Sequence, residues 1–109
     1  MTEVKFFKQD NNYVGILCEG HTGFAEYGKD IVCAAISSIT GALALGVTQV
    51  LKIRASVKKN DKKGYLELRL PKKIDESELL RAQVLFETAH IALLDLQEGY
   101  PSNINVEVN

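Results

Sequence analysis

The chain has 109 residues, of which 46% are hydrophobic and 25% charged, and its formal net charge is −1. This size predicts one domain over residues 1–109 with a single buried core. The balanced charge argues against nucleic acid as a direct partner, because phosphate binding shows as a basic excess or patch. No apolar run reaches the ~18–20 residues that span a bilayer, and the N-terminus lacks a signal-peptide pattern. We therefore expect a cytoplasmic protein without a membrane partner, whose two cysteines are free thiols.

The N-terminal segment predicts a β-hairpin followed by a loop. Residues 4–8 and 13–19 are short runs of β-forming residues, and the polar run 9–12 between them is typical of a hairpin turn. Residues 20–29 contain three glycines and predict a loop.

Asp30 marks the beginning of the first predicted helix. Aspartate is a favoured N-cap residue, so we predict a helix over residues 31–45, with Gly46 as the residue that ends it. Apolar side chains occupy most of the circumference of this helix. Such a helix is expected to be buried on several sides or to form an interface.

The next segment predicts a second hairpin. Apolar and polar residues alternate over residues 50–57, as in a half-buried strand. The lysine-rich run 58–64 is expected to form the turn. Residues 65–70 then predict a second strand, which ends at Pro71.

A second helix is predicted after Asp75, which forms a capping box with Glu78. Residues 99–101, Gly-Tyr-Pro, end this helix, and residues 104–108 alternate as a last strand. The order β-β-α-β-β-α-β predicts an α+β fold, in which two helices pack on a mixed sheet. The inner face of the second helix is expected to carry Leu79, Ala82, Phe86, Ala89, Leu93 and Leu96.

Two residues that flank the glycine-rich loop predict a thiol site. His21 follows the second strand, and Cys33 falls at the third position of the first helix if Asp30 is the N-cap. The partial positive charge of a helix N-terminus stabilises a thiolate. A nearby histidine can take the thiol proton and later protonate a leaving amine, and helix N–H groups can bind an oxyanion. The pattern therefore favours nucleophilic catalysis by Cys33 with His21 as the general base.

Each of these residues also has a structural interpretation. A cysteine at a helix start is often a small buried hydrophobe, His21 is a candidate surface-loop residue, and Ser37 can bond the carbonyl one turn back. Asp30 can cap the helix and also orient the histidine. Cys18 lies on the apolar face of its strand and is predicted to be a core residue. Cys18, His21 and Cys33 are only three potential zinc ligands, so we predict neither a metal nor another cofactor.

The residues around the loop resemble a known family. Gly20 and His21, eight further residues, and then the run Asp-Ile-Val-Cys-Ala-Ala-Ile-Ser from Asp30 to Ser37 are similar to the signature of the ribosomal-processing cysteine proteases, called Prp. The resemblance covers nearly the whole chain. It includes the length, the element order and the late helix that ends in Glu-Gly-Tyr-Pro.

The resemblance implies a role for each matched residue. Cys33 matches the nucleophile, His21 the general base, and Asp30 an acidic residue that supports the site. Gly20 and Ser37 match recurrent positions around them. The loop resembles the family's mobile substrate-binding loop, whose residues here include Thr22, Gly23 and Phe24.

Prp proteases remove a short N-terminal extension from a bacterial large-subunit ribosomal protein, number twenty-seven of that subunit, and form homodimers. The resemblance therefore implies a cysteine endopeptidase whose partner is that extension. Two other classes stay open. One is a non-catalytic binding module, which under this resemblance would dock on ribosomal protein or assembling ribosomes. The other is a thiol redox sensor, which lacks a second cysteine within reach along the sequence.

Overall fold

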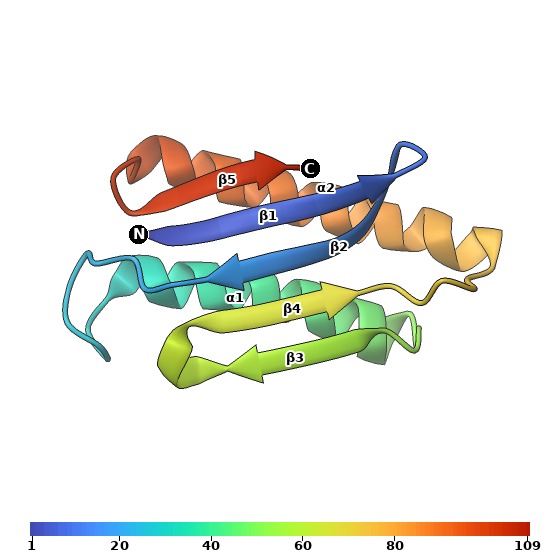
Figure 1. Ribbon diagram of the computed structural model, residues 1–109, viewed down its shortest axis with the longest axis horizontal. Helices are drawn as coiled ribbons and strands as arrows, with labels where there is room; N and C mark the ends of the chain where they lie inside the picture. Colours follow the sequence, from blue (N-terminus) through green and yellow to red (C-terminus); the bar gives the residue numbers. More distant parts are fainter.

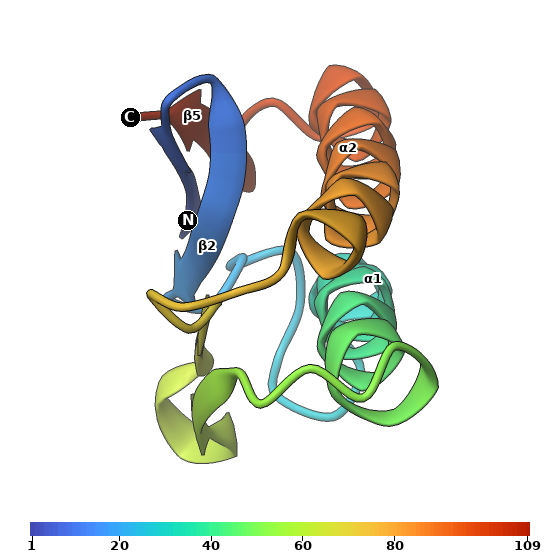
Figure 2. The same ribbon diagram turned by 90° about the vertical axis from the view of Figure 1, so that its right-hand side faces the viewer.

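The computed structural model describes residues 1–109 as a five-stranded sheet packed against two long helices (Figure 1). The strand order is β3-β4-β2-β1-β5, and only the β1–β5 pair is parallel, so the sheet is mixed. Figure 2 shows both helices on the same side of the sheet, where apolar side chains from both layers form one core. The predicted α+β class and the order β-β-α-β-β-α-β are confirmed.

The predicted N-terminal hairpin lies at the centre of the sheet. It consists of β1 (Thr2–Gln9) and β2 (Asn12–Glu19), which pair antiparallel. Its turn places Asp10 and Asn11 at positive φ, a conformation that Asp and Asn tolerate better than other non-glycine residues. In β1 and β2, the side chains on one face of the sheet point into the core. The end of β2 sets the point at which the following loop leaves the sheet.

The helical segment that begins at Ile31 extends past the end of the predicted helix. α1 (Ile31–Leu45) has the predicted bounds, but the chain continues through a π-helical turn, η1 (Gly46–Val50). Gly46 directly follows α1, as predicted, but it keeps right-handed helical dihedrals instead of the left-handed ones of a glycine that ends a helix. A Cβ atom at Gly46 would lie 2.9 Å from Cδ1 of Leu85, so a larger residue here would require the Leu85 side chain of α2 to shift.

The joined segment Ile31–Val50 is 20 residues long with a mean hydropathy of 2.0, so by length and composition alone it could cross a membrane. This finding contradicts the expectation that no apolar run is long enough to do so. Core helices of soluble proteins share these properties. Here Val32, Ile36 and Leu43 are buried in the core, and 33% of the apolar window is buried in all.

The third strand begins later than predicted. β3 is Ser56–Asn60 rather than residues 50–57, because the helical segment continues through Val50. The residues between them cross from the helix to the sheet, and the N–H of buried Ile53 bonds to the Val47 carbonyl at 3.0 Å instead of to a strand. The apolar alternation therefore indicated burial but not strand pairing. The predicted turn is correspondingly shorter, with the 3₁₀ segment η2 (Asp61–Lys63) at its tip.

The C-terminal elements follow the prediction closely. β4 (Tyr65–Arg69) pairs antiparallel with β3 and β2. α2 (Glu76–Gly99) begins after Asp75, whose Oδ1 accepts a hydrogen bond from the Glu78 N–H at 3.1 Å. β5 (Ile104–Val108) then lies parallel to β1. The buried residues of α2 all belong to the predicted inner face: Ala82, Phe86, Ala89 and Leu93.

A partly buried polar pair joins β2 to α2 beside the core. The Tyr13 hydroxyl and His90 Nδ1 lie 2.7 Å apart, and the rings of His90 and Phe6 pack with centroids 4.6 Å apart. Burial and then the charge of Lys8 lower the pKa of His90 below 6.5, against the opposite effect of Glu87. His90 is therefore a structural residue that is neutral in the folded protein at neutral pH.

We expect His90 to make the protein less stable in mild acid. Because folding lowers its pKa, its contribution to stability is complete above about pH 6.5 and is lost as the pH falls through the folded-state pKa. Urea unfolding between about pH 7 and pH 5 should show a smaller loss of unfolding free energy in His90→Gln than in the unmodified protein. The same pH dependence in both proteins would contradict this account.

Candidate active site

The loop after β2 and the first turn of α1 form the candidate site. Asp30 is the N-cap of α1, and its Oδ1 accepts a hydrogen bond from the Cys33 N–H at 2.9 Å. Cys33 therefore occupies the third position of the helix, as predicted, and it is only partly buried. The positive end of the helix dipole lies beside its thiol and attracts anions.

Asp30 also holds the loop together. Its Oδ2 accepts hydrogen bonds from the Thr22 hydroxyl and from the backbone N–H groups of Phe24 (3.1 Å) and Ala25 (3.3 Å). No hydrogen bond joins Asp30 to His21. Of capping the helix and orienting the histidine, the structure therefore shows only the capping, and the hydrogen bond to Thr22 joins Asp30 to the residue next to His21.

The Asp30 carboxylate is charged at neutral pH although only 9% of the residue is exposed. Burial raises its pKa, but the hydrogen bond from Thr22 and those from the N–H groups of Cys33, Ala25 and Phe24 together outweigh burial and lower the pKa below 3.8. The stability that these bonds contribute is therefore present above that pH and is lost as the pH falls through the folded-state pKa.

Replacing Asp30 by alanine should destabilise the protein by about 1–3 kcal/mol, because the change removes an N-cap and leaves loop N–H groups without an acceptor. Asp75→Ala is the matched control. It removes the N-cap of α2, whose carboxylate bonds only to the Glu78 N–H, and should cost less. Urea unfolding measures both losses, and peptide cleavage should fall in the Asp30 variant alone. Equal stability and equal cleavage in the two variants would contradict the loop-holding role.

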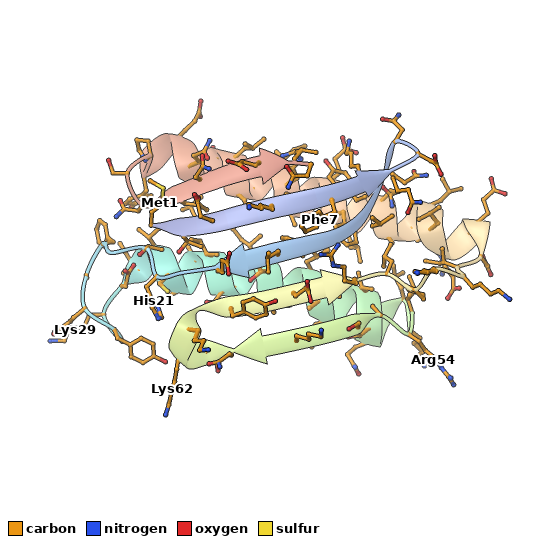
Figure 3. All side chains as sticks on the ribbon, viewed as in Figure 1. Met1, Phe7, His21, Lys29, Arg54 and Lys62 are labelled. Atoms are coloured by element: carbon orange, nitrogen blue, oxygen red, sulfur yellow. The ribbon has the colours of Figure 1, made fainter.

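His21 points from the end of β2 toward the β3–β4 hairpin, as Figure 3 shows. Its Nε2 lies 2.7 Å from the backbone carbonyl oxygen of Lys62, in η2 at the tip of that hairpin. On the loop side, the Tyr27 ring meets the His21 ring edge-on, with centroids 5.8 Å apart. His21 is thus held between the loop and the hairpin although it is exposed.

His21 and Cys33 line the same two cavities. The first has a volume of about 330 Å³ and is also lined by Gly20 and Ser37. The second has a volume of about 510 Å³ and is also lined by Asp30 and Ser37. No hydrogen bond joins His21 to Cys33. The structure therefore brings the predicted nucleophile and base to one space without direct contact between them.

Cys18 is a second thiol in this region. It is a core residue, as predicted, with 5% exposure, but it also lines the smaller cavity. Burial, followed by the charges of Cys33 and Glu19, raises the pKa of Cys18 to about 12. Cys18 therefore stays a neutral thiol. Cys18 is distant from Cys33 along the sequence, but in the structure both thiols line the same cavity.

Three of the predicted loop residues lie outside both cavities. Thr22 is buried, and its carbonyl accepts a hydrogen bond from the Asn103 side-chain amide at 3.0 Å. The Phe24 ring packs edge-on against Tyr100, with centroids 5.4 Å apart. Gly23 has a φ of 72°, which suits glycine. These residues shape the loop and anchor it to the segment after α2.

Sequence analysis missed Tyr27 within the loop, and it missed the residues that reach the site from other segments: Lys62, Tyr100 and Asn103. Lys62 takes part through its main-chain carbonyl, which no side-chain motif could reveal. The one signal available for this contact was Gly64, a glycine in a lysine-rich turn. No group of three or more His, Cys, Asp or Glu side chains lies together as a metal site would require.

Two of the four N–H groups at the start of α1 are open to an oxyanion. The Cys33 N–H is bonded to Asp30 Oδ1, and the Ala34 N–H is bonded to the Asp30 carbonyl at 3.1 Å. Of the first four N–H groups of α1, those of Ile31 and Val32 are therefore the ones without a partner in the protein.

A cysteine at a helix start and a histidine on the same cavity are the arrangement expected of a cysteine protease. Residues 1–105 of the chain match the family described as Cysteine protease Prp. The chain belongs to this family and is a cysteine protease, as the resemblance of its loop motif indicated.

Individual relatives agree with the family match. The Ribosomal processing cysteine protease Prp of Bacillus subtilis (strain 168) is 25% identical over 100 residues, which cover 92% of this chain and 89% of that protein. A crystal structure of an essential ribosomal processing protease Prp from S. aureus, in complex with a covalently linked product peptide, has a TM-score of 0.87 at 24% identity. Another, in complex with a substrate peptide, has a TM-score of 0.82 at 23% identity. Both comparisons cover the two chains completely and establish the shared fold.

Proposed function

We propose that Cys33 is the nucleophile and His21 the general base of a cysteine endopeptidase. His21 takes the thiol proton, the Cys33 sulfur attacks the scissile carbonyl, and the amine leaves with that proton, so that a thioester remains for water to hydrolyse. The observation that carries this assignment is the placement of both side chains on the same cavities, with Cys33 in the first turn of α1. Membership of a protease family favours this function over a non-catalytic binding module.

The remaining site residues support this pair. Asp30 is a positioning residue, because it caps α1 at Cys33 and holds the loop that carries His21. Ser37 lies one helical turn after Cys33 and lines both cavities, so we assign it a contact with the bound peptide. The other supporting residues belong to the loop: Gly20, Thr22, Gly23 and Phe24.

We infer that the substrate is the N-terminal extension of large-subunit ribosomal protein twenty-seven. The support is that the relative from Bacillus subtilis is named a ribosomal processing protease, and that the S. aureus protease was crystallised with product and substrate peptides. We place the protein in the cytoplasm, where ribosomal proteins are made, and expect a homodimer. Exposed apolar side chains on both helices support an interface: Leu45, Leu80, Val84 and Ile91.

Catalysis in this proposal requires a movement of the loop. In the free protein, His21 is bonded to the hairpin and makes no hydrogen bond to Cys33. Closure of the loop over an extended peptide brings the two side chains within hydrogen-bond reach, while the His21 ring keeps its contact with the hairpin. Weak reactivity of the thiol without substrate is therefore compatible with catalysis.

The test is mass spectrometry of the extended ribosomal protein from the same organism after incubation with this protease under reducing conditions. We expect cleavage at one site that releases the extension. The same ribosomal protein produced without its extension is the control and should stay uncut. An extended protein that remains intact, or cleavage at many sites in both proteins, would contradict the proposed substrate.

A further inference from the structure

We propose that the backbone carbonyl of Lys62 is the group that orients His21, so that the tip of the β3–β4 hairpin, and not a carboxylate, completes the catalytic arrangement. This inference rests on the proposed function and deepens it, since it adds a positioning residue from outside the loop motif.

The contact between His21 and Lys62 fixes which ring nitrogen carries the proton. A carbonyl oxygen can only accept a hydrogen bond, so the His21 Nε2 that lies 2.7 Å from it must be protonated. A neutral imidazole holds one proton, so Nδ1 is left as an acceptor. Nδ1 is therefore the nitrogen that takes the Cys33 proton. The carbonyl then stabilises the imidazolium, as the third group of a catalytic triad does.

The acidic residue of the site is not free to take this role. Both oxygens of the Asp30 carboxylate are engaged, Oδ1 by the Cys33 N–H and Oδ2 by the Thr22 hydroxyl and two loop N–H groups. None of its hydrogen bonds reaches the His21 ring. Asp30 orders the loop, whereas the hairpin supplies the acceptor for the histidine.

The hairpin is shaped to bring this carbonyl to His21. The Asn60 side chain caps η2 by accepting a hydrogen bond from the Lys63 N–H at 3.3 Å. Gly64 ends η2 with a φ of 59° and a ψ of 44°, and a Cβ atom there would lie 2.6 Å from the Gly20 carbonyl oxygen. Glycine therefore allows both the left-handed conformation and the close approach to the residue before His21.

The side chain of Lys62 has no part in this contact. It is exposed and extends from the tip of the hairpin away from His21 (Figure 3). Lys62→Ala keeps the carbonyl and is therefore the matched control for a change that displaces it. Gly64→Ala displaces the carbonyl, because the added Cβ forces the hairpin away from Gly20.

The experiment compares the unmodified protein, Lys62→Ala and Gly64→Ala, each as the full chain. Long-range ¹H–¹⁵N NMR spectra of the neutral His21 ring report which nitrogen is protonated, and kcat/KM is measured against pH with the extension peptide. We expect the Nε2–H tautomer and normal kcat/KM in the unmodified protein and in Lys62→Ala. In Gly64→Ala we expect a mixture of tautomers, a shifted pH profile and a kcat/KM about 10²-fold lower.

Three results would overturn the proposal. The first is an Nδ1–H tautomer in the unmodified protein, and the second is a Gly64→Ala protein that behaves like Lys62→Ala. The third is a rise of kcat/KM in Gly64→Ala, which would show that the contact keeps His21 away from Cys33. If Gly64→Ala does not fold, Asn60→Ala replaces it in the comparison with Lys62→Ala. This variant removes the side-chain cap of η2 without placing an alanine at positive φ. The tautomer is measured without substrate, so failure of this inference is distinguishable from failure of the proposed function, which would show as absent cleavage by the unmodified protein.

Discussion

Replacing Cys33 by alanine is expected to lower kcat/KM for cleavage of the extension peptide by at least about 10³-fold, because no nucleophile remains to form the thioester. The fold should survive, since Cys33 is only partly buried and its N–H, rather than its sulfur, bonds to the helix cap. Steady-state cleavage assays measure the rate, and urea unfolding of the same samples checks the fold.

Cys18→Ala is the matched control for this experiment, because it removes the other thiol that lines the same cavity. Burial keeps Cys18 neutral, with a pKa of about 12, so its removal should leave cleavage close to the unmodified rate. The variant should lose about 1 kcal/mol of stability as a core substitution. Cleavage that persists in Cys33→Ala, or that disappears in a folded Cys18→Ala protein, would refute the assignment of the nucleophile.

The second large effect is expected for His21→Ala, which should lower kcat/KM by about 10²–10⁴-fold. The variant loses the only histidine that lines the cavities, and with it the imidazole that takes the thiol proton and protonates the leaving amine. His21 is exposed, so the unfolding free energy should change little.

The control for this variant is His90→Gln, which removes the other histidine from the partly buried pair between β2 and α2. At neutral pH it should cleave the peptide at nearly the unmodified rate. If His90→Gln lost activity while folded and His21→Ala kept it, the general base would have to be sought elsewhere. Comparison of the two variants therefore separates a role in the chemistry from a role in stability.

The fold could be predicted where local rules and burial agree. Asp75 and Asp30 mark the helix starts through their capping carboxylates, and alternation marks β1, β2, β4 and β5. The prediction failed between Gly46 and Ala55, where a glycine suited to ending a helix instead keeps right-handed helical dihedrals. It lies against Leu85, which is distant in sequence.

The site could be predicted as far as its local motif extends. The spacing of His21, Asp30 and Cys33 indicated one thiol site, and the structure brings His21 and Cys33 to the same cavities. The hydrogen-bond partners of the loop could not be predicted, because Lys62 and Asn103 reach it only through the pairing of strands in the folded sheet. A motif of side chains does not show which main-chain groups will bond to them in the folded protein.

The most direct test of the account is to identify the residue that carries the acyl group during turnover. The reaction with the extension peptide is stopped with acid within the first turnovers, the protease is digested, and the fragments are analysed by mass spectrometry. The account predicts the mass of the N-terminal part of the substrate on the fragment that contains Cys33, and no adduct on the fragment that contains Cys18. An acyl group on any other residue would contradict the assignment of Cys33 as the nucleophile.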